Sequence, residues 1–225
     1  MNYLERIYLV FRDLFSQPHE RGESSAGYWQ DKIRSNVIAL TSQYKGKILE
    51  VGCGEGLFLS RFLRFNPRAD VYGVDTTNLC LGKAKERLAK ESLKAAKLIN
   101  AQAGALPFKN ASFDAVICAN VFICIDSLIS VKAIIQEMSR LCKTQGKLVI
   151  EFRNSRNPFL WLKYKLAKYY DHTIIEQKHP LSAFFREDIL SMLQDAGFHI
   201  VKEKIIDSFI IKSFAPIFII EAQKA

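Results

Sequence analysis

The sequence predicts an α/β fold in which a mostly parallel sheet is covered by helices on both faces. From Lys47 onward, short apolar runs of β type alternate with longer runs of helical periodicity, which is the pattern of strands joined by crossover helices. A glycine-rich turn follows the first of these runs. The chain has 225 residues and is 49% hydrophobic, which is enough for the buried core that such a sheet needs.

Two helices are expected before the sheet. Between residues 3 and 15, apolar side chains recur at helical spacing and indicate an amphipathic helix. A polar segment with Pro and Gly follows as a loop over residues 16–27, and a second helix is expected over residues 28–42. We therefore expect a helical extension over residues 1–45 and one main domain over residues 46–225.

The main domain is expected to continue as strand and helix in turn, interrupted once. The expected strands are KILEV, DVYGVD, AKLIN, FDAVICAN and KLVIEF. A long interruption over residues 153–185 comes next, and the helix REDILSMLQDAGF follows it, with Gly197 as its stop signal. Two further β-type runs, over residues 199–206 and 216–222, end the chain.

The charge is basic and unevenly distributed. The net charge is +9, which is compatible with a nucleic acid, an anionic membrane surface or an acidic substrate. Residues 79–100 carry six basic against two acidic side chains, and so do residues 153–180. In the first patch, the basic residues alternate with Leu and Ala as on the solvated face of an amphipathic helix. The second patch is the more informative about partners.

Cysteine usage and hydropathy indicate the compartment. Five cysteines without a C-x-x-C pair predict neither a disulfide framework nor a metal site. The N-terminus lacks the unbroken apolar core of a signal peptide, because Glu5, Arg12 and Asp13 interrupt it. The longest apolar run, over residues 115–125, is too short to cross a bilayer. These features predict a reduced, cytoplasmic protein without a transmembrane segment.

The glycine-rich turn has the sequence ILEVGCGEGLF over residues 48–58. A dinucleotide site uses G-x-G-x-x-G, in which a helix N-terminus receives a pyrophosphate. Here Leu57 occupies the third glycine position, and Glu50 and Glu55 would repel a pyrophosphate. A cationic ligand without phosphate meets no such penalty, and S-adenosylmethionine (SAM) carries a sulfonium and an ammonium group. The motif therefore favours SAM.

Five motifs in order resemble those of the class I SAM-dependent methyltransferases, mainly over residues 46–152. They are ILEVGCGEGLF, YGVD, AQAGALPF, FDAVICAN and RLCKTQGKLVIE. The resemblance implies a Rossmann-like, doubly wound fold with seven strands, of which the C-terminal one is antiparallel. It also implies SAM as cofactor and a small molecule as methyl acceptor.

The resemblance also implies roles for individual residues. The cofactor loop would comprise Glu50, Gly52, Cys53, Gly54 and Gly56. After the second strand, Asp75 would accept hydrogen bonds from both ribose hydroxyls, with Thr76 beside it, because two carboxylate oxygens match a cis-diol. The alternative for Asp75 is a helix N-cap. Gln102 and Ala103 would contact the adenine, and Asn120 would approach the cofactor or acceptor after the fourth strand.

Two positions depart from the family pattern. Gln102 stands where an acidic residue often meets the adenine amino group, although its amide oxygen can accept the same hydrogen bond. Before the fifth strand, Lys-Thr-Gln-Gly over residues 143–146 replaces the common Lys-Pro-Gly-Gly. We expect Gly146 to supply one positive-φ position there, and the turn to change while the fold stays intact.

The acceptor is less closely defined by the sequence than the cofactor. Enzymes of this fold that methylate amino groups of nucleobases tend to carry Asn/Asp-Pro-Pro-aromatic after the fourth strand, and this chain has Ala-Asn-Val-Phe over residues 119–122. That difference favours a small organic acceptor, with nucleic acid disfavoured. Cys118 and Cys124 lie in an apolar run and are expected in the core. An RNA methyltransferase and a non-catalytic SAM-binding regulator remain as alternatives.

The interruption over residues 153–185 is expected to form a lid over the carboxyl ends of the strands, together with the N-terminal helices. Its segment PFLWLKYKLAKYY mixes aromatic and aliphatic residues with lysines, as interfacial helices do. This favours an apolar or amphipathic substrate and peripheral membrane contact. The sequence fits equally well a cap helix whose lysines extend their charged ends to the solvent. No oligomeric state is indicated.

Candidate acceptor-site residues come from the lid and the N-terminal helices. His179 and His172 are the candidate general bases, because both lie in the lid and His titrates near neutral pH. Tyr28, Trp29 and Trp161 are candidate walls of the acceptor pocket. Arg34 is a candidate partner for the methionine carboxylate of SAM, with a solvent-exposed position as the alternative.

Overall fold

A computed structural model describes residues 3–14, 16, 18–20, 27–93, 96–167, 169, 181–207 and 212–225. Its centre is a seven-stranded sheet in the order β3-β2-β1-β4-β5-β7-β6. The strands are β1 (Lys47–Val51), β2 (Asp70–Asp75), β3 (Lys97–Asn100), β4 (Phe113–Cys118), β5 (Cys142–Arg153), β6 (Phe198–Ile206) and β7 (Ile217–Lys224). The pairs from β3 to β5 are parallel, and β7 runs antiparallel to both of its neighbours. The predicted sheet, including its antiparallel last strand, is confirmed.

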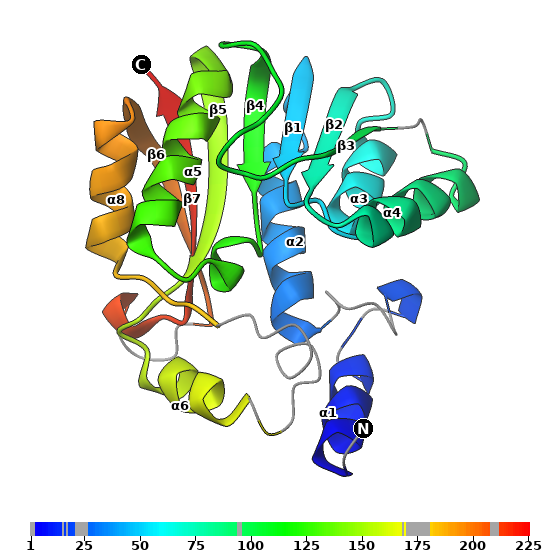
Figure 1. The fold of residues 1–225 in the computed structure, drawn as a ribbon, viewed down its shortest axis with the longest axis vertical. Helices are drawn as coiled ribbons and strands as arrows, with labels where there is room; N and C mark the ends of the chain where they lie inside the picture. The colour runs from blue at the N-terminus through cyan, green and yellow to red at the C-terminus, as the bar shows by residue number, and fades with distance from the viewer. Residues whose placement is uncertain are drawn as a thin grey trace.

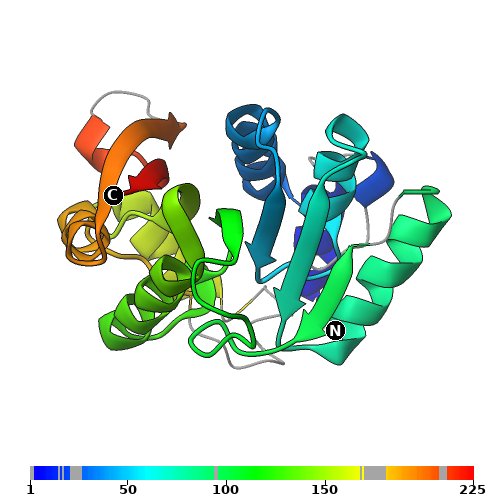
Figure 2. The same ribbon diagram turned by 90° about the horizontal axis from the view of Figure 1, so that it is seen from above.

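Helices cover both faces of the sheet (Figure 1, Figure 2). One face carries α2 (Tyr28–Thr41), α3 (Leu57–Phe65) and α4 (Asn78–Lys90), whose apolar residues share a buried cluster with Ile48, Val71 and Ile117 of the strands. The other face carries α5 (Leu128–Leu141) and α8 (Arg186–Asp195), which pack in a second cluster with Val116 and Leu148. The sheet therefore has a buried layer on each side.

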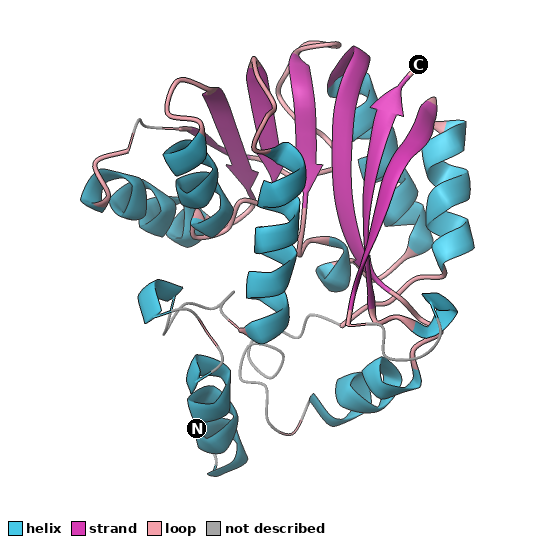
Figure 3. Ribbon diagram, turned by 180° about the vertical axis from the view of Figure 1, so that it is seen from behind, coloured by secondary structure: helices cyan, strands magenta, loops and turns pink. Residues whose placement is uncertain are grey.

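The carboxyl ends of β1 to β5 all point to one end of the molecule (Figure 1). At this end the chain order reverses between β1 and β4, because successive strands after β1 are added on one side and those from β4 on the other. Ligands of open α/β sheets bind at such a switch point. Helices α1 (Tyr3–Leu14) and α6 (Pro158–Ala167) lie beyond the same end (Figure 1, Figure 3).

The N-terminal helices differ in how they attach. Helix α2 buries Ile33 and Val37 completely against the sheet, so it is packed as part of the main layer. Helix α1 and the short helix η1 (Pro18–Glu20) precede it. The expected boundaries at residues 45 and 46, and the extent of the lid over residues 153–185, stay predictions. Within the described residues, no helix has the length and apolar character needed to span a bilayer.

Two local predictions were wrong. Cys124 is exposed on the short helix η2 (Phe122–Cys124), whereas Cys118 is buried as expected, because the strand ends between them. In the turn inside β5, the positive φ of 62° falls on Gln145 and not on Gly146. Gly146 is required for space, since a Cβ there would lie 2.7 Å from the Lys143 carbonyl oxygen.

Candidate cofactor and acceptor site

The glycine loop is anchored to the neighbouring strand by its backbone. The N–H groups of Gly52 and Cys53 both donate to the carbonyl oxygen of Val74, at 2.7 and 2.9 Å. The three loop glycines all have positive φ, and Gly56 is the N-cap of α3. A Cβ on Gly54 would meet nothing within 4 Å. The loop thus presents bare backbone at the carboxyl end of β1, with open space in front of Gly54.

Asp75 ends β2 directly beside this loop. Its Oδ2 accepts the Gly54 N–H at 2.9 Å, and its Oδ1 accepts the Thr77 N–H at 2.9 Å. The N-cap of α4 is Thr77, so the alternative in which Asp75 caps that helix is not what the structure shows. A carboxylate oxygen has two acceptor directions, so each oxygen keeps one for a ligand hydroxyl.

Glu50 is the second carboxylate at the site. It is buried in β1, and no group within the described residues donates a hydrogen bond to its Oε2. Burial raises the pKa of Glu50 well above its ordinary value, repulsion by Asp75 adds to the rise, and Arg34 opposes it. An orphaned buried acceptor is costly without a partner. The site is therefore short of a positively charged hydrogen-bond donor, which the ammonium group of SAM can supply.

Glu55 has a different role from the one the sequence suggested. Its carboxylate is buried and accepts a hydrogen bond from Lys83 at 2.7 Å, while Arg87 donates to its backbone carbonyl oxygen at 3.0 Å. Both basic residues belong to α4, in the patch that was interpreted as a plain solvated face. Two of its members thus hold the glycine loop, and Glu50 and Asp75 are the carboxyl groups that remain to face a ligand.

The remaining predicted cofactor residues lie along the same edge. Cys53 turns its buried side chain toward Gly73, so that only its backbone faces the loop opening. Thr76 is exposed, and its carbonyl oxygen accepts from the Asn100 side chain at 2.8 Å. The Ala101 N–H donates to the Asp75 carbonyl oxygen at 3.1 Å, which places the following Gln102 and Ala103 next to β2.

Asn120 is held by a buried ion pair that the sequence analysis missed. Glu151 and Arg153 are each 1% exposed and pair at 2.7 Å. The Asn120 N–H donates to Glu151 at 2.8 Å, and its side-chain oxygen accepts from Arg153 at 3.2 Å. Asn120 has a φ of 61°, a left-handed conformation that Asn tolerates better than most residues. Two residues of β5 thereby fix the loop that follows β4.

Arg34 is buried, so the alternative of a solvent-exposed position is wrong. It forms an ion pair with Glu20, which is itself fully buried, and Arg61 binds the same carboxylate at 2.6 Å. A methionine carboxylate would share Arg34 with Glu20, so the predicted role of Arg34 stays a prediction. The pairing connects η1 to α2 and α3, and no sequence signal marked Glu20 for it.

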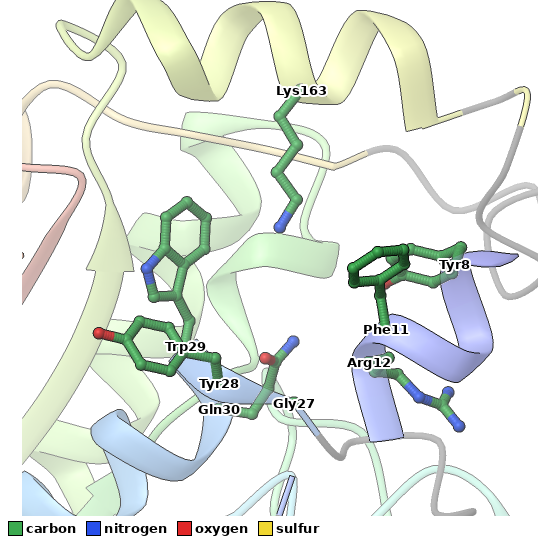
Figure 4. A pocket seen from close by; sticks show the side chains of 8 residues that line it. All are labelled: Tyr8, Phe11, Arg12, Gly27, Tyr28, Trp29, Gln30 and Lys163. Carbon is green, nitrogen blue, oxygen red and sulfur yellow. The ribbon is translucent and has the colours of Figure 1, made fainter. Parts of the chain in front are cut away.

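A pocket of about 240 Å³ lies between α1, the start of α2 and α6 (Figure 4). Its lining residues are Tyr8, Phe11, Arg12, Gly27, Tyr28, Trp29, Gln30 and Lys163. The Lys163 ammonium lies 4.3 Å from the centre of the Trp29 ring. The indole N–H of Trp29 donates to Asp207 at 3.0 Å, which fixes the ring. The walls are aromatic, and the polar groups are the cations of Arg12 and Lys163, the Gln30 amide and the two tyrosine hydroxyls.

The structure brings together only some of the predicted acceptor residues. Tyr28 and Trp29 line the pocket, whereas Trp161 is 63% exposed on α6 and is not among the lining residues. His172 and His179 lie outside the described residues. Tyr8, Phe11, Arg12 and Lys163 were not predicted. The periodicity of α1 could have indicated the first three, but not which side of that helix faces the domain.

Comparisons with known proteins agree with this geometry. A family of methyltransferase domains matches residues 43–197. A phosphatidylethanolamine N-methyltransferase of Cereibacter sphaeroides is 28% identical over 152 residues, which is 64% of this chain and 70% of that protein. A demethylmenaquinone methyltransferase of Staphylococcus aureus (strain Newman) is 32% identical over 154 residues, 64% of this chain and 59% of that protein.

Solved structures share the fold. The magnesium protoporphyrin IX methyltransferase of Synechocystis PCC 6803 with bound SAH superposes with a TM-score of 0.70 at 20% identity, covering 97% of this chain and 100% of that one. A SAM-dependent methyltransferase of Methanosarcina mazei gives 0.65 at 20% identity, covering 84% and 96%. The chain belongs to the methyltransferase domain family, and its class is that of the class I SAM-dependent methyltransferases.

Proposed function

We propose that this enzyme transfers the methyl group of SAM to a small organic acceptor with a large apolar part. The observation that carries the proposal is the aromatic pocket between α1, the start of α2 and α6, beyond the carboxyl ends of the parallel strands. Trp29 precedes Arg34 by five residues, about 7.5 Å along the helix axis. Arg34 in turn lies within electrostatic reach of Glu50. Helix α2 therefore borders the pocket with Trp29 and lies near the cofactor loop with Arg34.

The relatives support an acceptor of this kind. Phosphatidylethanolamine, demethylmenaquinone and magnesium protoporphyrin IX, named in their descriptions, are all molecules with extended apolar portions. An aromatic wall suits such a portion, because ligand pockets are mostly apolar with a few polar groups that fix orientation. Lys163 would orient an electron-rich or anionic head group.

SAM supplies an electrophilic methyl group on its sulfonium. The chain's own residues hold the donor and exclude water. In the proposed arrangement, the backbone from Gly52 to Gly56 receives the methionine part, Asp75 binds the ribose diol and Glu50 faces the positive charge. Gln102 and Ala103 meet the adenine, and Asn120 lies between cofactor and acceptor. Methyl transfer is an in-line displacement, so holding the two reactants at near-attack distance provides much of the rate enhancement.

A general base is needed only where the acceptor atom carries a proton that must leave. We retain His172 and His179 as the candidates for that role. Replacing both with Ala should remove the fall of kcat/KM at acidic pH that a His with a pKa of about 6.5 would cause. An unchanged pH profile in the double variant would eliminate both residues as bases.

The acceptor class can be tested by following a labelled methyl group. The enzyme is incubated with methyl-labelled SAM and each of three acceptors: a bacterial lipid extract in detergent, total RNA and total protein. We expect label in the organic-solvent extract with the wild type, and none with Asp75→Ala. Label that enters RNA or protein, and not the organic phase, would overturn the proposal in favour of a macromolecular acceptor.

Two lysines of α6 provide a matched test of the pocket. Lys163 lines it, whereas Lys165 lies two residues further on and contacts the exposed Trp161, at 4.9 Å from the ring centre. With a detergent-solubilised acceptor, Lys163→Met should raise the KM for the acceptor while leaving the KM for SAM unchanged. Lys165→Met should change neither. Equal effects of the two variants would show that the pocket does not bind the acceptor.

A further inference from the structure

Helix α1 turns its apolar side away from the protein. Glu5 is only 5% exposed and faces inward, whereas Tyr3, Leu4, Val10 and Leu14 are all exposed and do not line the pocket. A surface helix of a globular protein normally does the opposite and packs its apolar stripe on the core. Among the described residues, nothing covers the outward apolar side of α1.

Helix α6 is apolar on both sides. Leu160 and Ala167 pack inward and are each 1% exposed. On the outer side, Phe159, Leu162 and Leu166 follow one another at helical spacing and are exposed, with Phe159 at 78%. A helix that is apolar all round is usually buried all round. The outer side of α6, like that of α1, is suited to an apolar environment.

The two exposed sides belong to one end of the molecule. Both helices lie beyond the carboxyl ends of the strands, in front and rear views alike (Figure 1, Figure 3). They also border the same pocket, α1 with Tyr8 and Phe11 and α6 with Lys163 (Figure 4). We call the exposed apolar side chains of α1 and α6 that do not line the pocket the docking face. The pocket lies between its two halves.

The charges around the docking face favour an anionic partner. On α1, one acidic side chain is buried and the other is paired: Glu5 is 5% exposed, and Asp13 pairs with Arg12 at 3.2 Å. The basic Arg6 is exposed on the same helix. On α6, Lys165 is exposed and stacks over Trp161, as snorkelling lysines do at a lipid interface. A second copy of the chain would bring basic residues against basic residues, so self-association is disfavoured.

We infer that the docking face binds the surface of an anionic lipid bilayer, so that the pocket opens toward the membrane. Aromatic and aliphatic side chains would enter the headgroup region while Arg6 and Lys165 meet the lipid phosphates. Delivery of an amphipathic acceptor from the membrane into the pocket rests on the function proposed above. Binding of the protein to the bilayer does not depend on that function.

The test is co-sedimentation of the whole chain with vesicles. Phosphatidylcholine vesicles with and without phosphatidylglycerol are compared at low and high salt. A variant of the docking face carries Val10→Gln, Leu14→Gln, Phe159→Gln and Leu162→Gln, none of which lines the pocket. The matched control is Phe65→Gln, because Phe65 is equally exposed but ends α3 at the opposite end of the sheet. Gln adds no charge, so only apolar burial is removed.

We expect the wild type and Phe65→Gln to bind the anionic vesicles, and more weakly at high salt. The four-fold variant should bind at least about tenfold more weakly, since each buried apolar side chain contributes to partitioning. Absence of vesicle binding by the wild type, or equal binding by the variant, would overturn the inference. So would a wild-type dimer in solution that the four substitutions dissociate, because the partner would then be a second copy.

SAM binding is measured by titration on the same samples. This separates the inference from the proposed function. Vesicle binding without SAM binding would contradict only the function, and SAM binding without vesicle binding would contradict only the docking.

Discussion

The carboxylate of Asp75 accepts the backbone N–H of Gly54 at 2.9 Å, which joins the end of β2 to the glycine loop after β1. The same carboxylate is placed to bind the ribose hydroxyls of SAM. It therefore has two tasks, shaping the loop and binding the ligand, and both depend on its oxygens and its charge.

Replacing Asp75 should consequently reduce the affinity for SAM by more than the loss of a single contact would. Asp75→Asn keeps the shape but loses the charge, and we expect it to bind SAM at least about tenfold more weakly, because hydrogen bonds to an ionised acceptor are the stronger kind. Asp70→Ala is the control, since Asp70 begins the same strand and pairs with the exposed Lys97. Calorimetric titration of both variants checks this; equal affinities would contradict it.

Substitutions of the loop glycines should have different effects on stability and on SAM binding. A Cβ on Gly52 would lie 2.2 Å from a Val121 methyl group, so Gly52→Ala should lower the free energy of unfolding by about 2–4 kcal/mol. Gly54 faces open space, so Gly54→Ala should cost only about 1 kcal/mol for its positive φ and yet block SAM. Urea unfolding and SAM titration separate the two effects.

Gly82→Ala serves as the control for these substitutions. Gly82 lies within α4 with nothing within 4 Å of its would-be Cβ, so Ala should stabilise the protein by about 0.5–1 kcal/mol and leave SAM binding unchanged. If Gly54→Ala bound SAM as well as Gly82→Ala does, the space in front of Gly54 would not be the cofactor site.

Cofactor binding should release a proton from Glu50. The pKa of this buried carboxyl is raised well above 4.5, and a bound cation would lower it again. SAM affinity should therefore increase as the pH rises from 4.5 toward the raised pKa, and Glu50→Gln should remove this dependence. Titrations in buffers of different ionisation enthalpy count the protons released. No proton release by the wild type at any pH in this window would refute the assignment.

The same carboxyl should destabilise the ligand-free protein above pH 4.5. A group with a raised native pKa binds more protons in the folded state, so stability falls as the pH rises through the window between the unfolded and native values. Without SAM, Glu50→Gln should be more stable than the wild type at neutral pH and similar to it below 4.5.

The buried Glu151–Arg153 pair should be more important to stability than any surface pair. Arg153→Met leaves Glu151 charged and uncompensated at 1% exposure, so we expect a loss of about 3–5 kcal/mol in the free energy of unfolding. The exposed pair Lys132–Asp195, at 3.7 Å, is the matched comparison, and Lys132→Met should cost less than about 1 kcal/mol. Denaturant unfolding of both variants provides the measurement, and similar losses would contradict the role given to the buried pair.

The parts of the site that could be predicted from sequence are those built within short stretches of chain. Gly52 and Gly54 directly follow the apolar strand β1, and Asp75 ends β2. The alternation of strand and helix therefore predicts that these residues lie at the same edge of the sheet and close to one another. Parallel strands end at the same side of a sheet, which makes the prediction of a shared site a matter of topology.

The parts that could not be predicted depend on long-range packing. Arg34 meets Glu20 only because η1 folds back over α2. The exposed position of Cys124 depends on β4 ending at Cys118, a boundary that an unbroken apolar run hides. The periodicity of α1 indicates an apolar stripe but not the side to which it turns, and that side carries the inferred membrane contact.

Calorimetric titration of the wild type with SAM, SAH and NAD shows whether the loop between Gly52 and Gly56 forms a SAM site together with Asp75. Both adenosyl ligands should bind in the micromolar range and NAD should not, because Leu57 stands where a pyrophosphate-binding loop has its third glycine and Asp75 adds a negative charge beside the loop. Binding of NAD, or of none of the three ligands, would contradict this assignment.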